Sequence, residues 1–384
     1  MKIALFDYVV TQNNGIGKAD LAILAALCHE HEFTVFSVEF ENPCPERIRW
    51  VRIPALKRPL VLLFVTFHLL APLCYLWHRL RYRVHFDHVQ IIESNLLFGD
   101  IAYSHFCHRA FLKDHWKDAG ATGLRGALRW LDHWLHARLE PCVYRRASRI
   151  VAPSRGLARE LITAYPSASS KICLLANSID LENLRRPDNF DRDGFRGDLG
   201  LTSEDVVLVF VALGHYERKG LPLLIDALAG LTDPRPKLVV VGGSRDVVAV
   251  YRGRATQAGL NGDVHFVGTQ REVRPYLWAA DALVLPSHYE VFPLVALEAA
   301  AAGLPLLVTP LNGVEEFLRD GENGFLTSRD VPGVSGCIAR FAQMSPQQRC
   351  DMGRRAQRDV ARYGVPQFVS GWSKLYREVG LHGG

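Results

Sequence analysis

A chain of 384 residues, 48% hydrophobic and 22% charged, is long enough for two domains that each bury a core. Its eight cysteines are irregularly spaced without a CxxC pair, and its first residues lack the order of a secretory signal, so we expect a cytoplasmic protein. The net charge of +5 comes from residues 1–199, which hold 26 Lys and Arg against 21 Asp and Glu, while residues 200–384 hold 19 of each. This surplus is too sparse for a duplex-binding protein, so we expect no nucleic-acid partner; an anionic lipid surface, a phosphorylated substrate and an ordinary solvated surface remain open.

The chain begins with a pattern of strand, glycine loop and helix. Lys2–Val10 is almost wholly apolar, as expected of a strand buried on both faces, and Gly15 and Gly17 precede a helical pattern that starts at Lys18. Such a loop lets backbone amides approach an anion, which makes Gly15 a candidate phosphate contact. The same residues also suit an ordinary tight turn.

An uncharged stretch of nineteen residues, Pro59–Trp77, follows. It is nearly long enough to span a bilayer. Pro72 breaks a helical hydrogen bond and His68 is costly in lipid, so a buried helix, or one lying in the membrane interface, is favoured over a spanning helix. Basic residues stand on both sides of the stretch, which makes contact with an anionic membrane surface one expectation: Arg47, Arg49, Arg52, Lys57 and Arg58 before it, and Arg79, Arg81 and Arg83 after it.

Two more buried strands are predicted at Val89–Glu93 and Ile101–Phe106, and a His-Phe-Cys-His run begins at His105. With His115 this run contains the side chains of a zinc site, but the spacing matches no standard ligand pattern, and neighbouring strand residues point to opposite faces of a sheet. We therefore favour a single functional histidine, His105, at the strand end.

The two halves are joined where periodicity disappears, and we place the linker at residues 186–203 because charge, Gly and Pro accumulate there. Asp191-Arg192-Asp193 has the form of a metal-binding DxD, but in a linker it is interpreted as a surface run. Beyond it, short apolar strands alternate with helices, which predicts a parallel sheet covered on both faces. The strands are expected at Val206–Leu213, Leu238–Val241, Val264–Val267, Ala282–Leu285, Leu306–Val308 and near Phe325, and the tail Pro346–Val379 is expected to be helical.

The loop after the first of these later strands carries two cations. Gly214 follows the strand, and Arg218 and Lys219 precede the next helix. Ligands of open parallel sheets bind beyond the carboxyl ends of the strands, so this loop is expected to face a ligand. Arg218 can grip two oxygens of a diphosphate and Lys219 can act as a point charge, although a solvated basic loop has the same composition.

Two carboxylates surround the start of a later helix. Glu290 lies in the loop after Ala282–Leu285, and Glu298 lies about one turn inside the small-residue helix that follows. Helix amides near Leu294 and Val295 can meet phosphate oxygens, since a helix N-terminus attracts anions. Glu298 can accept hydrogen bonds from two neighbouring hydroxyls such as those of a ribose, the alternative being a solvent-facing helical Glu.

The spacing of Glu290 and Glu298 resembles the E-x7-E signature of retaining glycosyltransferases of family 4, and the likeness extends over most of the chain. The Arg218-Lys219-Gly220 loop is similar to that of lipopolysaccharide-core hexosyltransferases within the family. Two loops depart from the pattern: Gly15-Ile16-Gly17 stands where a Gly-Gly pair is common, and Glu290-Val291-Phe292-Pro293 stands where Glu-Gly-Phe-Gly is frequent. Further supporting runs lie at 264–268, 280–287, 312–316 and 320–324.

This resemblance implies an α/β fold of the GT-B type, with two Rossmann-like, doubly wound parallel-sheet domains facing a cleft. The acceptor would bind residues 1–185 and the nucleotide diphosphate sugar residues 204–355, and a helical segment, 356–384, would cross back to the first domain. The resemblance also implies roles for single residues. The diphosphate would be held by Arg218 and Lys219, with Gly214, Leu294 and Val295 nearby. The ribose would be bound by Glu298 and the transferred sugar by Glu290. His105 would touch that sugar from the first domain, and Gly15 would lie beneath the phosphates.

The activity so implied is retaining transfer of a hexosyl unit to a glycan or lipid-linked acceptor in cell-surface polysaccharide or lipopolysaccharide synthesis, at the cytoplasmic membrane face. Fixed positive groups would stabilise the departing phosphate, so no metal or other cofactor is expected. Two alternatives stay open: a sugar-nucleotide epimerase of the same architecture, and a non-catalytic protein that binds sugar nucleotides. A dehydrogenase is disfavoured, because neither half has GxGxxG between its first strand and helix.

Overall fold

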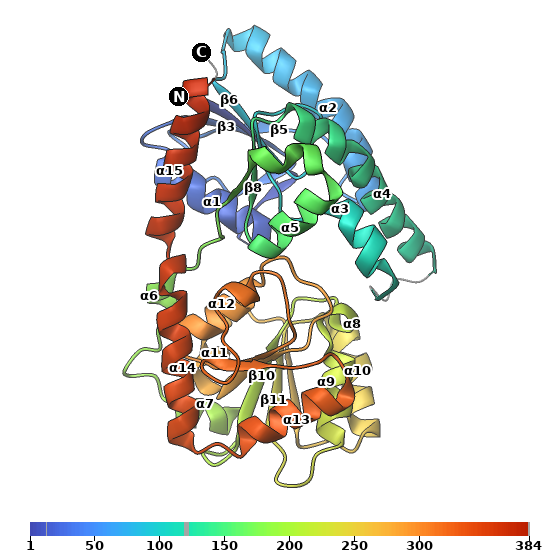
Figure 1. Cartoon of the computed structure of the whole chain (residues 1–384), viewed down its shortest axis with the longest axis vertical. Coiled ribbons are helices and arrows are strands. Elements are labelled where there is room, and N and C mark those ends of the chain that lie inside the picture. The colour runs from blue at the N-terminus through green and yellow to red at the C-terminus, as the bar shows by residue number, and fades with distance from the viewer. Residues whose placement is uncertain (13, 119–122, 383–384) are drawn as a thin grey trace. The chain divides into compact units, whose positions relative to one another are not determined.

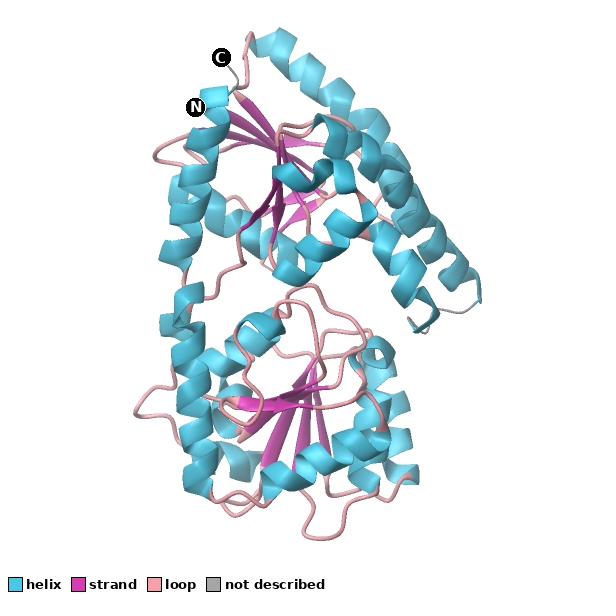
Figure 2. Cartoon of the chain, in the orientation of Figure 1, coloured by secondary structure: helices cyan, strands magenta, loops and turns pink. Residues whose placement is uncertain are grey.

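The structure is a computed structural model that describes residues 1–12, 14–118 and 123–382 (Figure 1). The chain divides into two compact units. The first comprises Met1–Lys117, Ala121–Ser178 and Val365–Gly384, and the second is chiefly Ile179–Gly364. Each unit has its own sheet with helices packed around it (Figure 2).

The first unit is built on a seven-stranded parallel sheet. Across the sheet the strands are β5 (Arg49–Arg52), β3 (Glu32–Ser37), β1 (Lys2–Phe6), β6 (His88–Ile92), β7 (Ile101–Tyr103), β8 (Arg149–Ala152) and β9 (Ile172–Leu174). Two further short strands, β2 (Val9–Val10) and β4 (Glu39–Phe40), pair in parallel outside this sheet. The strand order reverses between β1 and β6, the position at which doubly wound sheets bind ligands.

Helices cover both faces of this sheet. Alternate residues of β1 therefore face two different cores: Ile3 and Leu5 share one with Trp372, whereas Phe6 stacks on Phe36 and meets Tyr75 edge-on. Because both faces are covered, four consecutive residues of β1 are buried. The helices are α1 (Gly15–Leu27), α2 (Leu60–Tyr82), α3 (His108–Ala110) with a π-helical turn at Phe111–His115 and a 3-10 turn at Trp116–Asp118, α4 (Gly123–Arg146), α5 (Arg155–Ala164) with a 3-10 segment at Pro166–Lys171, and α15 (Val365–His382).

Among the helices that the structure describes, α2 is the one long and apolar enough to cross a membrane by length and composition. The mean hydropathy of its most apolar stretch is 2.1, and only 22% of that stretch is buried. The helix contains Pro72 and continues five residues beyond the predicted end at Trp77.

The second unit contains a six-stranded sheet in which all neighbouring strands are parallel. Their order is β12 (Val264–Gly268), β11 (Lys237–Val241), β10 (Val207–Val211), β13 (Ala282–Leu285), β14 (Leu306–Val308) and β15 (Gly324–Leu326). The order reverses between β10 and β13, so this sheet also has a switch point. The predicted fold class, α/β with two doubly wound parallel sheets, is confirmed.

Helices again flank the sheet of the second unit (Figure 1). They are α6 (Leu181–Leu184), α7 (Arg192–Asp198), α8 (Tyr216–Lys219), α9 (Leu221–Ala229), α10 (Arg245–Gln257), α11 (Arg274–Ala279), α12 (Leu294–Ala301), α13 (Val331–Ala342) and α14 (Pro346–Val360), with 3-10 turns at Val314–Glu316 and Ala361–Tyr363.

Local structure differs from the sequence-based expectations at four places. The strand expected over Lys2–Val10 stops at Phe6, where the Asp7 carboxylate accepts a hydrogen bond from the amide of Tyr8 at 2.7 Å. The edge strand β5 was missed because its polar Arg-Trp-Val-Arg sequence lacks the signal of a buried strand. The expected linker at 186–203 contains α7, and the expected helical tail divides at residues 361–364 into α14 and α15, of which only α15 belongs to the first unit.

The helix within the expected linker is anchored by an arginine. Arg196 is 1% exposed, and its guanidinium lies 3.0 Å from a carboxylate oxygen of Asp281. Arg192 pairs with the other oxygen of Asp281 at 2.7 Å. The arginine of the Asp-Arg-Asp run therefore forms an ion pair inside the second unit, although the run was expected to be a surface feature. Asp191 caps α7 by accepting from the amide of Gly194.

Candidate functional site

The two loops with the predicted phosphate and sugar contacts leave adjacent strands at the switch point of the second sheet. The loop after β10 reaches α8, and the loop after β13 reaches α12. They are joined by main-chain contact, since the amide of His288 donates to the carbonyl of Arg218 at 2.7 Å. Parallel pairing of β10 and β13 thus brings together segments that are 70 residues apart in sequence, as the 218–288 bond shows.

Glu290 is the centre of this arrangement. Its Oε1 lies 2.8 Å from Nζ of Lys219 and 3.3 Å from a guanidinium nitrogen of Arg218. The hydroxyl of Ser287 donates to the same oxygen at 3.0 Å. Arg218 also donates to the carbonyl of Tyr289. Both cations and the carboxylate are largely shielded from water, with side chains 13–19% exposed.

These contacts decide the ionisation of Glu290. Burial alone would raise the pKa of its carboxyl group, but the charges of Lys219 and Arg218, with hydrogen bonds from Lys219 and Ser287, outweigh burial and lower that pKa. Glu290 is therefore an anion at neutral pH. A carboxylate accepts hydrogen bonds from sugar hydroxyls, and two cations beside it can attract phosphate oxygens.

Gly220 lets the two loops approach each other. Its φ is +84°, and a Cβ atom there would lie 2.2 Å from the carbonyl oxygen of Pro286. Only glycine fits such a position without shifting the backbone. Gly214, by contrast, has open space around it, and His215 carries the left-handed backbone of this loop with φ +57°.

The remaining predicted donor contacts lie on α12. Leu294 and Val295 form the start of the helix and are partly buried, as is Glu298 one turn later. Gly313 packs closely against the preceding loop, since a Cβ atom there would lie 2.5 Å from the ring of Phe292. Seven of the nine predicted site residues thus belong to the second unit: Gly214, Arg218, Lys219, Glu290, Leu294, Val295 and Glu298.

Gly15 and His105 belong to the first unit. Gly15 is the exposed first residue of α1 and has open space around it, whereas Gly17 is the glycine that packing requires, because a Cβ atom there would lie 2.7 Å from the amide of Thr11. His105 lies two residues beyond β7, with its ring 4.1 Å from that of Tyr103. Burial lowers the pKa of His105 to about 4, so its imidazole is neutral at pH 7.

Sequence reasoning missed a set of polar residues at the switch point of the first sheet. Asp7 follows β1, and Glu93 and Asn95 follow β6; Glu93 has the uncommon backbone angle φ +51°. Buried polar atoms without a hydrogen-bond partner among the described residues include Oδ2 of Asp7, the hydroxyl of Tyr8, Oδ1 of Asn95 and Nε2 of His105. Unpaired buried polar groups are costly, and doubly wound sheets bind ligands at the switch point, so these atoms are candidate contacts of a polar ligand or of water. A signal was available in the sequence, because polar residues follow two apolar strands.

Among the residues that the structure describes, the run from His105 to His108 with His115 does not gather into a metal cluster. Glu93, His108 and His136 instead each offer one ligand atom within 4.8 Å of the others, so within the described ranges this group could hold a metal ion. Nε2 of His108 lies 3.3 Å from Glu93, and its Nδ1 lies 2.9 Å from Nδ1 of His133. These contacts equally form a protein-only network, in which Glu93 and other acids raise the pKa of His108 against the opposing effect of burial.

Asp7→Asn is expected to reduce the pH dependence of stability. Burial, chiefly, raises the pKa of Asp7 to about 8 from an ordinary value of 3.8. Between these two pH values the native protein therefore holds a proton that the unfolded chain has lost. The free energy of unfolding that the protonated carboxyl group contributes is complete below pH 3.8, and it is lost at roughly 1.4 kcal/mol per pH unit as pH rises towards 8. Thermal unfolding at pH 5 and pH 8 should show a smaller decline in Tm for the variant. An equal decline would contradict the assignment, and Asp226→Asn, an exposed carboxylate, is the control.

Two protein-family models match the chain. The model described as Glycosyltransferase Family 4 matches residues 14–183, and the model described as Glycosyl transferases group 1 matches residues 191–358. The matched ranges therefore take in most of the chain.

Individual proteins are also similar to the chain. A D-inositol 3-phosphate glycosyltransferase of Streptomyces avermitilis is 31% identical over 244 residues, which are 60% of this chain and 52% of that protein. The chain thus spans about half the length of the curated relatives it matches. The crystal structure of WaaG, a glycosyltransferase involved in lipopolysaccharide biosynthesis, has a TM-score of 0.77 at 19% identity, covering 97% of this chain and 99% of that one. HepE of Anabaena in complex with UDP-glucose has a TM-score of 0.73 at 19% identity, covering 98% of this chain and 100% of that one.

Proposed function

Because the chain belongs to the family 4 glycosyltransferases and has their GT-B fold, as its motifs predicted, we propose that it transfers a hexosyl unit with retention from a nucleotide diphosphate sugar to a glycan or lipid-linked acceptor. The observation that carries the proposal is the ionised Glu290, held between Arg218 and Lys219 at a switch point. This site combines an acceptor for sugar hydroxyls with cations for a diphosphate.

The donor binds the second unit in this proposal. Arg218 and Lys219 neutralise the diphosphate, assisted by Gly214 and by helix amides near Leu294 and Val295. Glu298 binds the ribose hydroxyls, and Glu290 binds the hydroxyls of the transferred sugar. A protein of the same fold binds UDP-glucose, which supports a donor of this class.

The reaction follows from the charge at the site. The bond between the anomeric carbon and the phosphate oxygen breaks, and Arg218, Lys219 and the helix amides stabilise the negative charge that develops on the leaving phosphate. The acceptor oxygen forms its bond to the anomeric carbon on the same face, and its proton passes to the leaving phosphate. Glu290 stabilises the oxocarbenium-like sugar. For His105, which is neutral at pH 7, and for Gly15 the proposal keeps the roles that the family resemblance implies, contact with the transferred sugar and with the phosphates.

The acceptor binds the first unit in this proposal. The unpaired polar atoms of Asp7, Tyr8 and Asn95 at its switch point suit an acceptor rich in hydroxyl groups. The fold likeness to a lipopolysaccharide glycosyltransferase supports a role in making lipopolysaccharide or another cell-surface polysaccharide. We place the protein in the cytoplasm, peripherally at the inner membrane face, and its eight free cysteines are consistent with a reducing compartment.

A donor screen tests this function. The donor should raise the Tm of the purified protein, since a ligand at a hundred times its Kd stabilises by about 2.7 kcal/mol. Transfer to candidate acceptors, with the anomeric configuration of the product read by NMR, should show retention. A product epimerised without acceptor would indicate the epimerase instead, and binding without turnover across an acceptor panel would indicate a binding protein.

Lys219→Met should weaken donor binding by about tenfold or more, because a hydrogen bond to a charged group contributes about 1.5–3 kcal/mol. The variant also removes a cation that lowers the pKa of Glu290, so the pKa of this carboxyl group should rise. As pH is lowered, Glu290 should therefore become protonated, and donor binding should be lost, at a higher pH in the variant than in the native protein. Calorimetry across a pH series measures both effects. Arg271→Met, an exposed cation of the same unit, is the control, and equal effects of the two substitutions would contradict the role of Lys219.

A further inference from the structure

The outer side of α2 exposes a continuous stripe of large apolar side chains. Leu62, Val65, Leu69, Leu73, Leu76 and Leu80 recur every three or four residues and are 40–70% exposed, so they share one face of the helix. Trp77 is 58% exposed beside them. A helix that is apolar on both its core side and its outer side is typical of a membrane contact, because water is a poor solvent for such a face.

The opposite side of α2 belongs to the core of the first unit. Phe67 meets the ring of Tyr8 at 4.8 Å, and Tyr75 lies against Phe6 and Phe36. Nε2 of His68 hydrogen-bonds to the carbonyl of Ser94 at 3.0 Å. If α2 crossed a bilayer it would leave this core open, so the helix can contact a membrane only by lying along its surface.

The sequence segment that contains α2 carries charge of a single sign, and one of its cations, Lys57, pairs with Glu39 outside the segment. Residues 47–86 contain eight Lys and Arg and no Asp or Glu, and the charges stand at the two ends of the apolar stretch. Arg49 of the edge strand β5 and Arg81 of α2 both lie over the ring of Tyr82, at 4.8 and 5.5 Å, which gathers cations at the C-terminal end of the helix. This arrangement complements the surface of an anionic lipid bilayer, which has an apolar interior and negatively charged headgroups.

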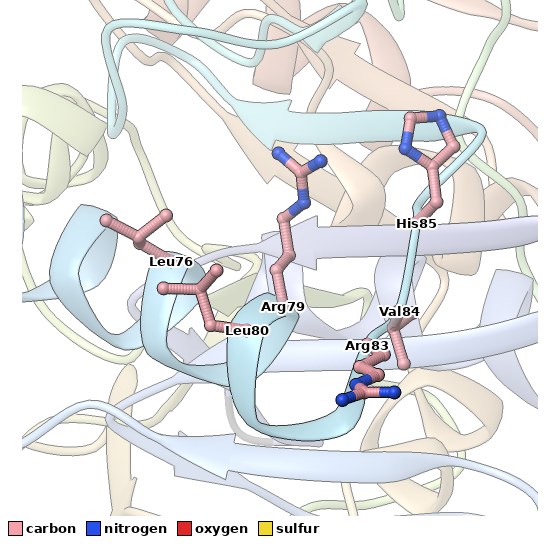
Figure 3. Close-up of a pocket in the computed structure, with 6 residues that line it drawn as sticks. All are labelled: Leu76, Arg79, Leu80, Arg83, Val84 and His85. Atoms are coloured by element: carbon pink, nitrogen blue, oxygen red, sulfur yellow. The ribbon is translucent and has the colours of Figure 1, made fainter.

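The C-terminal end of α2 also forms a pocket. It has a volume of about 330 Å³ and is lined by Leu76, Arg79, Leu80, Arg83, Val84 and His85 (Figure 3). Leucines of the outer stripe and two arginine side chains thus line one hollow, where an anionic phosphate can bind beside apolar surface.

We propose that the outer face of α2 is a monotopic membrane-docking surface that inserts its leucine stripe among acyl chains and binds anionic phospholipid headgroups with the basic groups at its C-terminal end. The inference deepens the proposed membrane localisation, and it does not depend on the transfer reaction. It assigns α2 an orientation in the plane of the bilayer and a preference for anionic lipid.

Flotation of the full chain with lipid vesicles tests the proposal. The protein should float with vesicles that contain phosphatidylglycerol and much less with phosphatidylcholine alone, and salt should weaken the difference. The combined variant Leu69→Gln, Leu73→Gln and Leu80→Gln should lower binding by on the order of tenfold or more. These side chains are exposed, so Tm should hardly change. Val250→Gln and Leu174→Gln, at exposed apolar positions outside α2, are the matched controls.

The charge component has a separate test. Arg81→Gln with Arg83→Gln should remove most of the preference for anionic vesicles, while Arg245→Gln with Arg271→Gln in the second unit should retain it.

The proposal would be overturned if the leucine variant bound vesicles as well as the native protein, or if the native protein did not float at all. A dimer in sedimentation that the leucine variant dissociates would also overturn it. Resistance of bound protein to alkaline carbonate extraction would overturn the in-plane orientation. Glu290→Gln should float like the native protein, which separates failure here from failure of the proposed reaction.

Discussion

Glu290→Gln is expected to reduce hexosyl transfer by on the order of a hundredfold or more, the loss seen when one stabilising group at a reaction centre is removed. Gln keeps the size of Glu but loses the charge that faces Lys219 and Arg218 at 2.8 and 3.3 Å. The developing positive charge on the sugar would lose its carboxylate, and kcat should fall more than donor affinity.

Steady-state transfer and donor calorimetry, with the donor found by thermal shift, measure the two effects separately. Glu290 has a lowered pKa, so its ionised form stabilises the fold above the ordinary pKa of 4.5, and this contribution is lost as pH falls. The Tm difference between native protein and variant should therefore shrink towards acid pH. Asp226→Asn removes a carboxylate from an exposed pair with Arg254 and should leave transfer unchanged. Full activity of Glu290→Gln would show that this site does not carry the reaction.

Gly220→Ala should strongly destabilise the second unit. The new Cβ atom would lie 2.2 Å from the backbone oxygen of Pro286, and φ +84° is itself unfavourable for alanine. Backbone must move to relieve this contact, so we expect destabilisation of roughly 3 kcal/mol or more, near the upper end for single substitutions. Because that movement separates the loops carrying Arg218 and Glu290, donor binding should fail as well.

Gly259→Ala separates the two causes. Gly259 has a similar φ of +74° but open space around it, so its substitution incurs only the backbone term of about 1 kcal/mol. Chemical denaturation of both variants, with donor calorimetry on the folded fraction, makes the comparison. Equal destabilisation would show that the contact with Pro286 is unimportant, and normal donor affinity of Gly220→Ala would contradict the link between loop approach and binding.

Local sequence predicted the parts of the fold that depend on near neighbours. Strands such as β10 and β13 are buried on both sides, so each appears as an apolar run, and the helix over Leu294–Ala301 follows from small residues between Pro293 and Gly303. The polar strand Arg49–Arg52 could not be recognised from the sequence, because it forms by pairing with β3 at the edge of the sheet and has no apolar run of its own. The 186–203 segment appeared unstructured because the burial of Arg196 depends on Asp281, 85 residues away.

By itself, the sequence determined the parallel α/β class and predicted a two-half organisation, and its motifs made Arg218, Lys219, Glu290 and Glu298 the predicted contacts of a nucleotide sugar. Tertiary structure alone decided that Glu290 lies between the two cations and is ionised, since these groups meet only when β10 pairs with β13. It also brought Asp7, Glu93 and Asn95 to one edge of the first sheet and exposed the outer face of α2. The reason is physical: strand propensity and helix periodicity act over a few residues, whereas ionisation, burial and the meeting of side chains depend on which distant segments are packed together.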